Sequence, residues 1–302
     1  MMIAAIRSDI EGIDHNVALY DDRNVVGRQT AIDFLDFHVL DRIDTLLQQN
    51  GPSTALLALK QYAARVKDQL EAVDTVFFQR LRASIRAGRC LGTSLRALIS
   101  SHTSPNSDSA NVPPAIGYDE LDVFTNGLFA TYPMPAETRE RAPEMVYYQK
   151  TPARIIFEVA RKAQFTGDDV FYDIGAGLGQ VAMWVNLLTG VITKGVELEP
   201  AYCTYASNCA VDLNLAQVTF VEADARSADY TDGTVFYMYT PFEGHLLQAV
   251  LDRIREASRG RQITLFTYGP CTHHVARQTW LKHIDHTPPD ADRLAEFRSV
   301  FG

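Results

Sequence analysis

Apolar residues in the first third of the chain recur at intervals of three and four, which is the spacing of an amphipathic helix. This pattern predicts one helix over 29–50, a longer one over 52–87 and a short one over 94–100. Residues 1–28 are mixed in character and show no clear period. Residues 1–110 are therefore expected to form an α-helical N-terminal region.

Beyond residue 150 the pattern changes, because short apolar runs alternate with stretches of helical spacing. Strands are expected at 170–174, 192–199, 218–222, 235–239, 262–268 and near 294–301. Helices are expected at 153–164, 180–188, 201–214 and 245–257, with a further one that follows Pro270 and runs to Leu281. Apolar strands that alternate with helices indicate a parallel sheet covered on both faces. We therefore predict a Rossmann-like, doubly wound α/β domain over 151–302.

The residues that connect these two parts differ in composition between their first and second halves. Residues 101–114 are rich in Ser, Asn and Pro and contain almost nothing to bury, which is typical of a linker or loop. Residues 116–150 contain several aromatic residues and are too apolar for a free linker. We expect the connecting segment, 111–150, to act as a lid that packs over the α/β domain near its ligand.

Composition narrows the functional classes. The 302 residues carry a net charge of −9, which argues against broad binding to nucleic-acid phosphates because such binding needs a dense basic surface. The four cysteines form no Cys-x-x-Cys pair, so neither a zinc site nor a disulfide framework is expected. No apolar run approaches the ~18 residues of a membrane span, and charged residues stand where a signal peptide needs its apolar core. A cytoplasmic protein without a bound metal is expected.

An aspartate and three glycines follow the first apolar run of the α/β domain. Asp173 ends this run, and Gly175, Gly177 and Gly179 come at every second position after it. Glycines are needed where the backbone turns sharply and a ligand approaches the main chain. The helix expected from Gln180 directs free N–H groups toward such a ligand. This strand, turn and helix predict a cofactor site.

Dinucleotide-binding enzymes use a related turn, Gly-x-Gly-x-x-Gly. If this pattern starts at Gly175, its last glycine position is occupied by Gln180, so the pattern fails. If it starts at Gly177, the last position is occupied by Ala182. An alanine is tolerated there, but this alignment gives Gly175 no role. The pattern Asp-x-Gly-x-Gly-x-Gly fits better. A nucleotide-dependent oxidoreductase remains the alternative enzyme class.

Further polar residues follow the next strands. Glu197 closes the second strand, where an acid can accept hydrogen bonds from both hydroxyls of a ribose. Asp224 and Ala225 follow the third strand, and Thr240 follows the fourth. Because ligands bind at the carboxyl ends of the strands in an open parallel sheet, these residues are expected to meet at one site.

The turn Asp173–Gly179 resembles motif I of class I S-adenosylmethionine (AdoMet) methyltransferases. The core, roughly 140–275, further resembles the non-SET histone-lysine methyltransferases, which have a Val-Tyr-Gly-Glu-Thr loop, an Asp-Leu-Gly-Ser-Gly-x-Gly-Gln turn and a Gly-Val-Glu strand end. The residues that match are Tyr148, Thr151, Asp173, Gly175, Gly177, Gly179, Gln180 and Gly195–Glu197. The resemblance implies a methyltransferase sheet that binds AdoMet through these residues, with Asp224 on the adenine amino group and the Ala225 N–H on the ring.

The chain departs from that family at two places. Gln149 and Lys150 replace the Gly-Glu of the loop, and Thr240-Pro241-Phe242 replaces an asparagine-containing motif that places the substrate amine. We therefore carry over cofactor binding and not the histone substrate. The acceptor is expected to be an amine, a protein lysine included, or a hydroxyl, on a protein or a small molecule.

Thr240 and Tyr147 are the candidate catalytic residues. Thr240 offers a hydrogen-bond acceptor for the proton of the nucleophile, and Tyr147 belongs to an aromatic group that closes the site. Because Thr240-Pro241-Phe242 is atypical, a non-catalytic adaptor that binds AdoMet and docks partners on its N-terminal helices is a second hypothesis.

Overall fold

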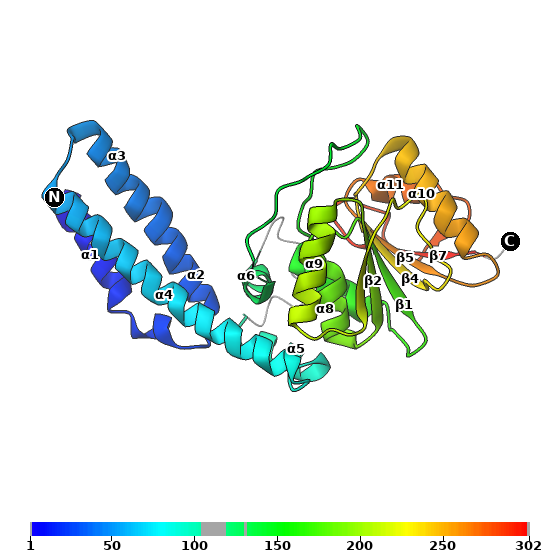
Figure 1. Cartoon of the computed structure of the whole chain (residues 1–302), viewed down its shortest axis with the longest axis horizontal. Helices are drawn as coiled ribbons and strands as arrows, with labels where there is room; N and C mark the ends of the chain where they lie inside the picture. Colours follow the sequence, from blue (N-terminus) through cyan, green and yellow to red (C-terminus); the bar gives the residue numbers. More distant parts are fainter. Residues whose placement is uncertain (1, 104–118, 130–131, 301–302) are drawn as a thin grey trace.

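The computed structural model describes residues 2–103, 119–129 and 132–300. Figure 1 shows the first four α-helices standing away from the α/β part of the chain, with the long helix α4 running from one to the other. None of the helices within these ranges is both long and apolar enough to cross a membrane.

The N-terminal helices confirm most of the predicted pattern. The helix predicted over 29–50 is present as α2 (Val25–Phe34), a π-helical segment η2 (Leu35–Leu40) and α3 (Asp41–Asn50). The next two predicted helices are α4 (Thr54–Arg86) and α5 (Gly92–Ser100). Helix α1 (Met2–Asp14) and the 3₁₀ turn η1 (Val17–Tyr20) were not predicted. Helix α1 buries only Ile6 and Ile10, so its apolar stripe is too short to stand out in the sequence.

A buried arginine joins these helices. Arg28 is fully buried, and its Nε donates a 2.7 Å hydrogen bond to Asp74 of α4. Its Nη1 donates to the Leu19 carbonyl at 3.0 Å. A buried charge is tolerated only when it is paired and hydrogen-bonded, so this residue fixes the connection before α2 onto α4.

The α/β part is built on a seven-stranded sheet of order β3-β2-β1-β4-β5-β7-β6. Its strands are β1 (Val170–Ile174), β2 (Ile192–Glu197), β3 (Val218–Glu222), β4 (Val235–Tyr239), β5 (Thr264–Tyr268), β6 (Leu281–His283) and β7 (Ala295–Ser299). Strands β1 to β5 are parallel, and β7 runs antiparallel to both of its neighbours. The predicted doubly wound α/β fold is confirmed, and the strand order reverses between β1 and β4, where such sheets bind ligands.

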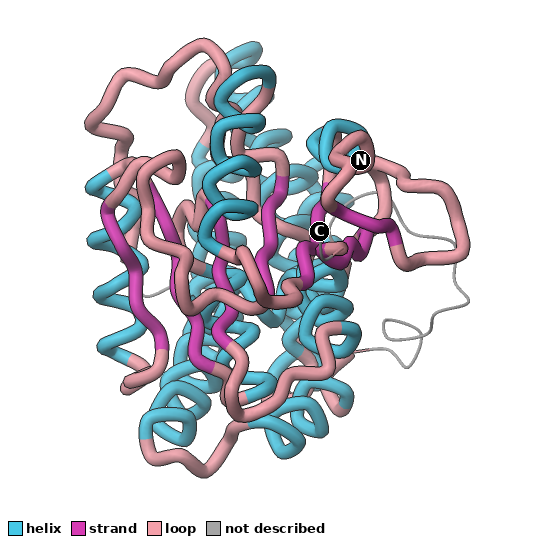
Figure 2. The backbone as a smooth tube through the Cα atoms, turned by 90° about the vertical axis from the view of Figure 1, so that its right-hand side faces the viewer, coloured by secondary structure: helices cyan, strands magenta, loops and turns pink. Residues whose placement is uncertain are grey.

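Helices cover both faces of the sheet (Figure 2). The helices are α7 (Ala153–Lys162), α8 (Gln180–Thr189), α9 (Pro200–Asp212), α10 (Gly244–Ala257) and α11 (Cys271–Val275). Neighbouring strand residues alternate between two cores: Phe171 packs with α7, α8 and α9, whereas Tyr172 packs with α10 and α11. Both faces are apolar for this reason, which explains why the strands appear as continuous apolar runs.

The C-terminal tail corrects one prediction. A helix was expected to reach Leu281, but α11 ends at Val275 and Leu281 begins β6, which pairs with β7. Trp280 and Leu281 are both buried against the sheet, so tertiary packing overrides the local helical spacing. Strand β2 also ends at Glu197 rather than at residue 199, because Glu199 is the N-cap of α9.

The connecting segment contains a helix that was not predicted, α6 (Glu120–Phe129). Most of the linker predicted at 101–114 lies outside the described residues. After α6, residues 132–151 have little regular structure and cross the carboxyl edge of the sheet. Thr138, Arg139 and Glu144 of this stretch form hydrogen bonds with the α/β part, whereas α6 also contacts α2 and α4.

Candidate cofactor and acceptor site

A cavity lies at the carboxyl ends of β1, β2 and β4, beneath residues 137–151, which we call the lid segment. Every site residue named from the sequence lines this cavity except Gly179. Those residues are Tyr147, Tyr148, Thr151, Asp173, Gly175, Gly177, Gln180, Glu197, Asp224, Ala225 and Thr240. No cluster of His, Cys, Asp and Glu side chains suited to a metal ion occurs among the described residues.

The three glycines form the turn between β1 and α8. All three have positive φ angles: 75° at Gly175, 54° at Gly177 and 77° at Gly179. A Cβ atom on Gly177 would overlap the ring of Tyr148, and one on Gly179 would overlap Phe220. These positions therefore require glycine both for their backbone conformation and for the close approach of aromatic rings.

Glu197 is locked into this turn. Its Oε2 accepts a 2.7 Å hydrogen bond from the Gly177 N–H, and its Oε1 accepts one of 2.8 Å from the Glu199 N–H. Burial raises the pKa of Glu197, against the lowering effect of these backbone donors. Each carboxylate oxygen keeps a second lone pair, so the side chain can still accept hydroxyl donors from a ligand.

Asp173 is the most deeply buried acid of the site, with 3% of its surface exposed. Its Oδ2 has no hydrogen-bond partner among the described residues. Burial, assisted by repulsion from Glu197, raises the pKa of Asp173 to about 7. A buried carboxylate with an unused acceptor beside a second acid is a site for a hydrogen-bond donor or a cation.

The residues after β3 line the same cavity. Asp224 forms an ion pair with Arg226, whose Nη2 lies 2.5 Å from Oδ2, and this hydrogen-bonded partner lowers the pKa of Asp224. Ala225 is buried, and its carbonyl accepts a 2.9 Å hydrogen bond from the Tyr230 hydroxyl. The loop is thus fixed at the edge of the cavity.

Hydrogen bonds anchor the lid segment at two points, near its start and near its middle. Near its start, Glu199 accepts hydrogen bonds from the Thr138 hydroxyl at 2.5 Å and the Arg139 N–H at 2.9 Å. Further along, Glu144 accepts from the N–H groups of His245 and Leu246, at 3.1 and 2.8 Å, and so caps the start of α10.

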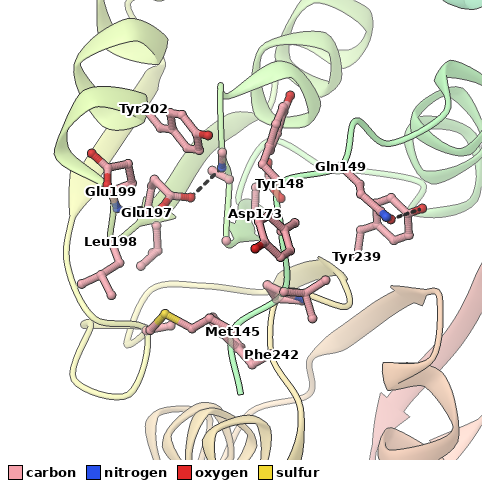
Figure 3. A pocket seen from close by; sticks show the side chains of 18 of the residues that line it. Met145, Tyr148, Gln149, Asp173, Glu197, Leu198, Glu199, Tyr202, Tyr239 and Phe242 are labelled. Carbon is pink, nitrogen blue, oxygen red and sulfur yellow. Dashed lines mark hydrogen bonds between the residues drawn. The ribbon is translucent and has the colours of Figure 1, made fainter. Parts of the chain in front are cut away.

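Directly after Glu144 the lid segment pairs with the residues that follow β4. Met145 forms a β-bridge with Phe242, and the Val146 N–H donates to the Pro241 carbonyl at 3.2 Å. Figure 3 shows Met145 and Phe242 together on one side of the cavity.

Tyr148 and Thr151 of the lid segment both line the cavity. Tyr148 lies over Gly177, and its ring is 5.6 Å from that of Tyr202. Thr151 is buried, with its Oγ1 3.2 Å from the hydroxyl of Tyr237. Tyr148 therefore lies against the glycine turn, and Thr151 lies against β4.

The two catalytic candidates have different surroundings. The Thr240 hydroxyl is buried; it donates to the Tyr268 carbonyl and accepts from the Cys271 N–H, both at 3.1 Å. Tyr147 is 72% exposed, and the guanidinium of Arg141 lies 3.2 Å above the centre of its ring. Thr240 thus fixes the strand end, and Tyr147 lies at the mouth of the cavity.

Several lining residues were not identified from the sequence. The Tyr239 hydroxyl donates to Gln149 Oε1 at 3.2 Å, and Glu199 and Tyr202 line the side near Glu197. Figure 3 shows Gln149 and Tyr239 on the opposite side of the view from Glu197, with Tyr148 and Asp173 between them. The lone signal for Tyr239 was its place at the end of a predicted strand.

Comparisons with known proteins give structural likenesses only. No protein-family model matches the chain, and no curated protein does. An RNA methyltransferase from Salinibacter ruber, solved with S-adenosyl-L-homocysteine, has a TM-score of 0.40 at 21% identity; the match covers 50% of this chain and 92% of that one. Precorrin-6y C5,15-methyltransferase from Geobacter metallireducens has a TM-score of 0.39 at 16% identity, over 54% of this chain and 94% of that one.

A third structure, TrmN from Thermus thermophilus, has a TM-score of 0.38 at 17% identity, over 48% of this chain and 47% of that one. At such similarity neither substrate nor activity transfers from one protein to another, because one fold serves many functions.

Proposed function

We propose that this protein is an AdoMet-dependent methyltransferase whose cofactor binds in the cavity under the lid segment. The observation that carries the proposal is the pairing of the glycine turn with two acids, the buried Asp173, which has an unused oxygen, and the partly buried Glu197. Glu197 would accept the ribose hydroxyls, and Asp173 would accept the α-ammonium group of the cofactor's amino-acid part. Asp224 and Ala225 would contact the adenine.

The position of Asp173 argues against a dinucleotide. A dinucleotide places its negatively charged pyrophosphate on the glycine turn. Here Asp173 is buried at the start of that turn, and its ionised carboxylate would repel a phosphate group, whereas Glu197 is compatible with the ribose of either cofactor class. AdoMet has no phosphate and carries positive charge, so it suits an acidic pocket. The oxidoreductase alternative is less consistent with the site for this reason.

Methyl transfer from a sulfonium is an in-line displacement, so the protein contributes mainly by positioning and by excluding water. The lid segment excludes water, and the rings of Tyr148, Tyr239 and Phe242 provide the aromatic walls that attract a cation. We assign the acceptor to the side of the cavity near the Tyr239–Gln149 pair, since Glu197 lies on the other side. That pair supplies a hydroxyl and an amide to orient an amine, a protein lysine included, or a hydroxyl.

Thr240 and Tyr147 fit supporting roles at the acceptor side. Because the Thr240 hydroxyl already has a donor and an acceptor, we propose that it holds the end of β4 against β5. Tyr147, stacked under Arg141, would cover the entrance.

Calorimetric titration tests the cofactor. We expect binding of S-adenosylhomocysteine and none of NAD; the reverse result would support the oxidoreductase. Incubation with labelled AdoMet and cell lysate, or with amine- and hydroxyl-bearing peptides, then tests turnover. Tight cofactor binding with no labelled product under any condition would favour the adaptor hypothesis, which the atypical Thr240-Pro241-Phe242 keeps open.

A further inference from the structure

Helix α6 lies between the N-terminal helices and the α/β part of the chain (Figure 1). It contacts α2 and α4 on the N-terminal side and α7 on the other. The ring of Phe124 is 5.9 Å from Phe77 and 5.8 Å from Phe78, both on α4. A Cβ atom on Gly127 would overlap Phe78, so α6 is seated closely on α4.

Two polar residues of α6 form hydrogen bonds with the α/β part of the chain, and one of them contacts a residue that lines the cavity. Asp122 Oδ1 accepts a 2.7 Å hydrogen bond from the Ala153 N–H at the start of α7. One helical turn later, Asn126 Oδ1 accepts from Lys150 Nζ at 3.3 Å and from Gln180 Nε2 at 3.1 Å. Neither Asp122 nor Asn126 lines the cavity, whereas Gln180 does.

The chemistry of this chain of contacts fixes the orientation of the Gln180 amide. A lysine ammonium can only donate, so the atom of Asn126 that faces Lys150 must be its oxygen. That same oxygen requires a donor from Gln180, so Gln180 turns its NH₂ group toward Asn126. Gln180 Oε1 is then the amide atom left over, and it is buried without a hydrogen-bond partner among the described residues.

We propose that Asn126 is a positioning residue for the cofactor site: it holds Gln180 so that its carbonyl oxygen accepts a hydrogen bond from the bound cofactor. This inference rests on the proposed function, because it needs a cofactor in the cavity. Since Asn126 belongs to a helix seated on α4, it also gives the N-terminal helices a part in cofactor affinity.

Substitutions of Asn126 test the inference, with S-adenosylhomocysteine as the titrated ligand. Asn126→Ala removes the acceptor, and we expect the dissociation constant to rise roughly three- to tenfold. Asn126→Asp keeps an acceptor for both Lys150 and Gln180, so it should bind within about twofold of the parent. If Asn126 contributed only to packing, Asn126→Ala and Asn126→Asp would not differ in this way in their dissociation constants.

A double-mutant cycle shows whether Asn126 acts through Gln180. In a Gln180→Ala background, Asn126→Ala should have no further effect on the dissociation constant. Tyr205→Phe is the matched control: it removes a 3.1 Å hydrogen bond from α9 to the Phe129 carbonyl of α6, away from the cofactor cavity, and should leave binding unchanged.

The outcomes separate this inference from the function it rests on. Parent-like binding by Asn126→Ala, or equal losses in both backgrounds of the cycle, would overturn the positioning role while leaving the methyltransferase proposal intact. A loss in Tyr205→Phe as large as that in Asn126→Ala would show that the seating of α6, and not Gln180, sets affinity. Absence of binding by the parent protein would overturn the proposed function itself.

Discussion

The carboxylate of Glu197, at the end of β2, accepts a 2.7 Å hydrogen bond from the backbone N–H of Gly177, the middle glycine of the turn after β1. Two neighbouring strand ends are therefore joined by a side chain before any ligand binds. The second oxygen of the same carboxylate receives the Glu199 N–H, which fixes its orientation. This acid is pre-organised to accept further donors on its remaining lone pairs.

Glu197→Ala is expected to weaken the binding of S-adenosylhomocysteine by about ten- to a hundredfold, because a hydrogen bond to a charged group contributes roughly 1.5–3 kcal/mol. The sequence alone favours an intermediate effect for Glu197→Gln, since the amide oxygen can still accept one hydroxyl. The structure changes this expectation. Both carboxylate oxygens receive backbone N–H groups, so the NH₂ of a glutamine would face one of them.

We therefore expect Glu197→Gln to bind about as weakly as Glu197→Ala. Calorimetric titration measures the affinity, and circular dichroism checks that both variants fold. Parent-like binding by Glu197→Ala would show that this acid does not hold the cofactor, and unfolding of the variant would give it a structural role instead.

Asp173 should make stability depend on pH. Burial and Glu197 raise its pKa in the folded protein to about 7, whereas an unfolded aspartate has a pKa of about 3.9. The folded state therefore holds the proton more strongly, and this contribution to stability is complete below pH ~4 and lost as pH rises through ~7. Asp173→Asn removes the ionisation and should raise the melting temperature at pH 8 relative to the parent.

The size of this effect has an upper bound of roughly 4 kcal/mol, from about three pKa units at 1.36 kcal/mol each. At pH 4 the variant and the parent should melt within a few degrees of each other. The same variant should lose cofactor affinity, because it no longer pairs with a cation. A variant that is less stable than the parent at pH 8 would contradict the raised pKa.

Cofactor binding should also release a proton. A cationic partner stabilises the ionised form of Asp173 and lowers its pKa from about 7. Near pH 6.5 a fraction of the free protein carries this proton, which then leaves on binding. Titrations of S-adenosylhomocysteine in phosphate and imidazole, whose ionisation enthalpies differ, should give different apparent enthalpies. Asp173→Asn is the control, and identical parent enthalpies in both buffers would contradict the pairing.

The strand ends and the glycine turn could be predicted because local chemistry determines them. Strands β1, β3 and β4 lie at the predicted residues, since each is an apolar run bounded by polar or turn-forming residues. The glycine turn has positive φ at the three glycines, as the spacing required. For a parallel sheet these features suffice to bring Asp173, Glu197 and Asp224 to one cavity.

What could not be predicted depends on contacts between distant parts of the chain. Helix α6 can be recognised only from its packing against α4. Its Asn126 accepts hydrogen bonds from Lys150 and Gln180, which are 24 and 54 positions away in the sequence. The hydroxyl of Thr240 was predicted to accept the proton of the nucleophile, whereas β5 and α11 supply two partners that already occupy it. Strand β6 is three residues long and exists through its pairing with β7.

Gly177→Ala should abolish or strongly weaken cofactor binding, whereas Gly190→Ala should not. Both glycines have positive φ, 54° and 76°, so both substitutions carry a backbone cost of roughly 1–2 kcal/mol. At Gly190 nothing lies within 4 Å of the new Cβ, whereas at Gly177 it would overlap Tyr148 and displace the lid. Thermal melting and titration distinguish them: equal losses of affinity would mean that strain, and not the contact with Tyr148, is responsible.

Glu199 gives the sharpest test of the lid segment. Its carboxylate accepts hydrogen bonds from Thr138 and Arg139 in the lid and from the Ala201 N–H at the start of α9. Burial alone would raise the pKa of Glu199, but these donors outweigh it and lower the pKa to about 2. Glu199→Ala should therefore release the start of the lid and lose roughly 1 kcal/mol of helix-capping stability.

Trypsin can report on this release, because Arg139 and Arg141 lie in the lid segment. Cleavage at these two residues should be faster in Glu199→Ala than in the parent, and S-adenosylhomocysteine should slow it in the parent by holding the lid closed. Ser53→Ala is the matched control, since Ser53 caps α4 through a hydrogen bond to the Leu56 N–H and has no contact with the lid. Ser53→Ala should lose a similar amount of stability without faster cleavage at Arg139 and Arg141. If both variants are cleaved faster at these two residues, lower stability and not the loss of the Glu199 hydrogen bonds exposes the lid segment.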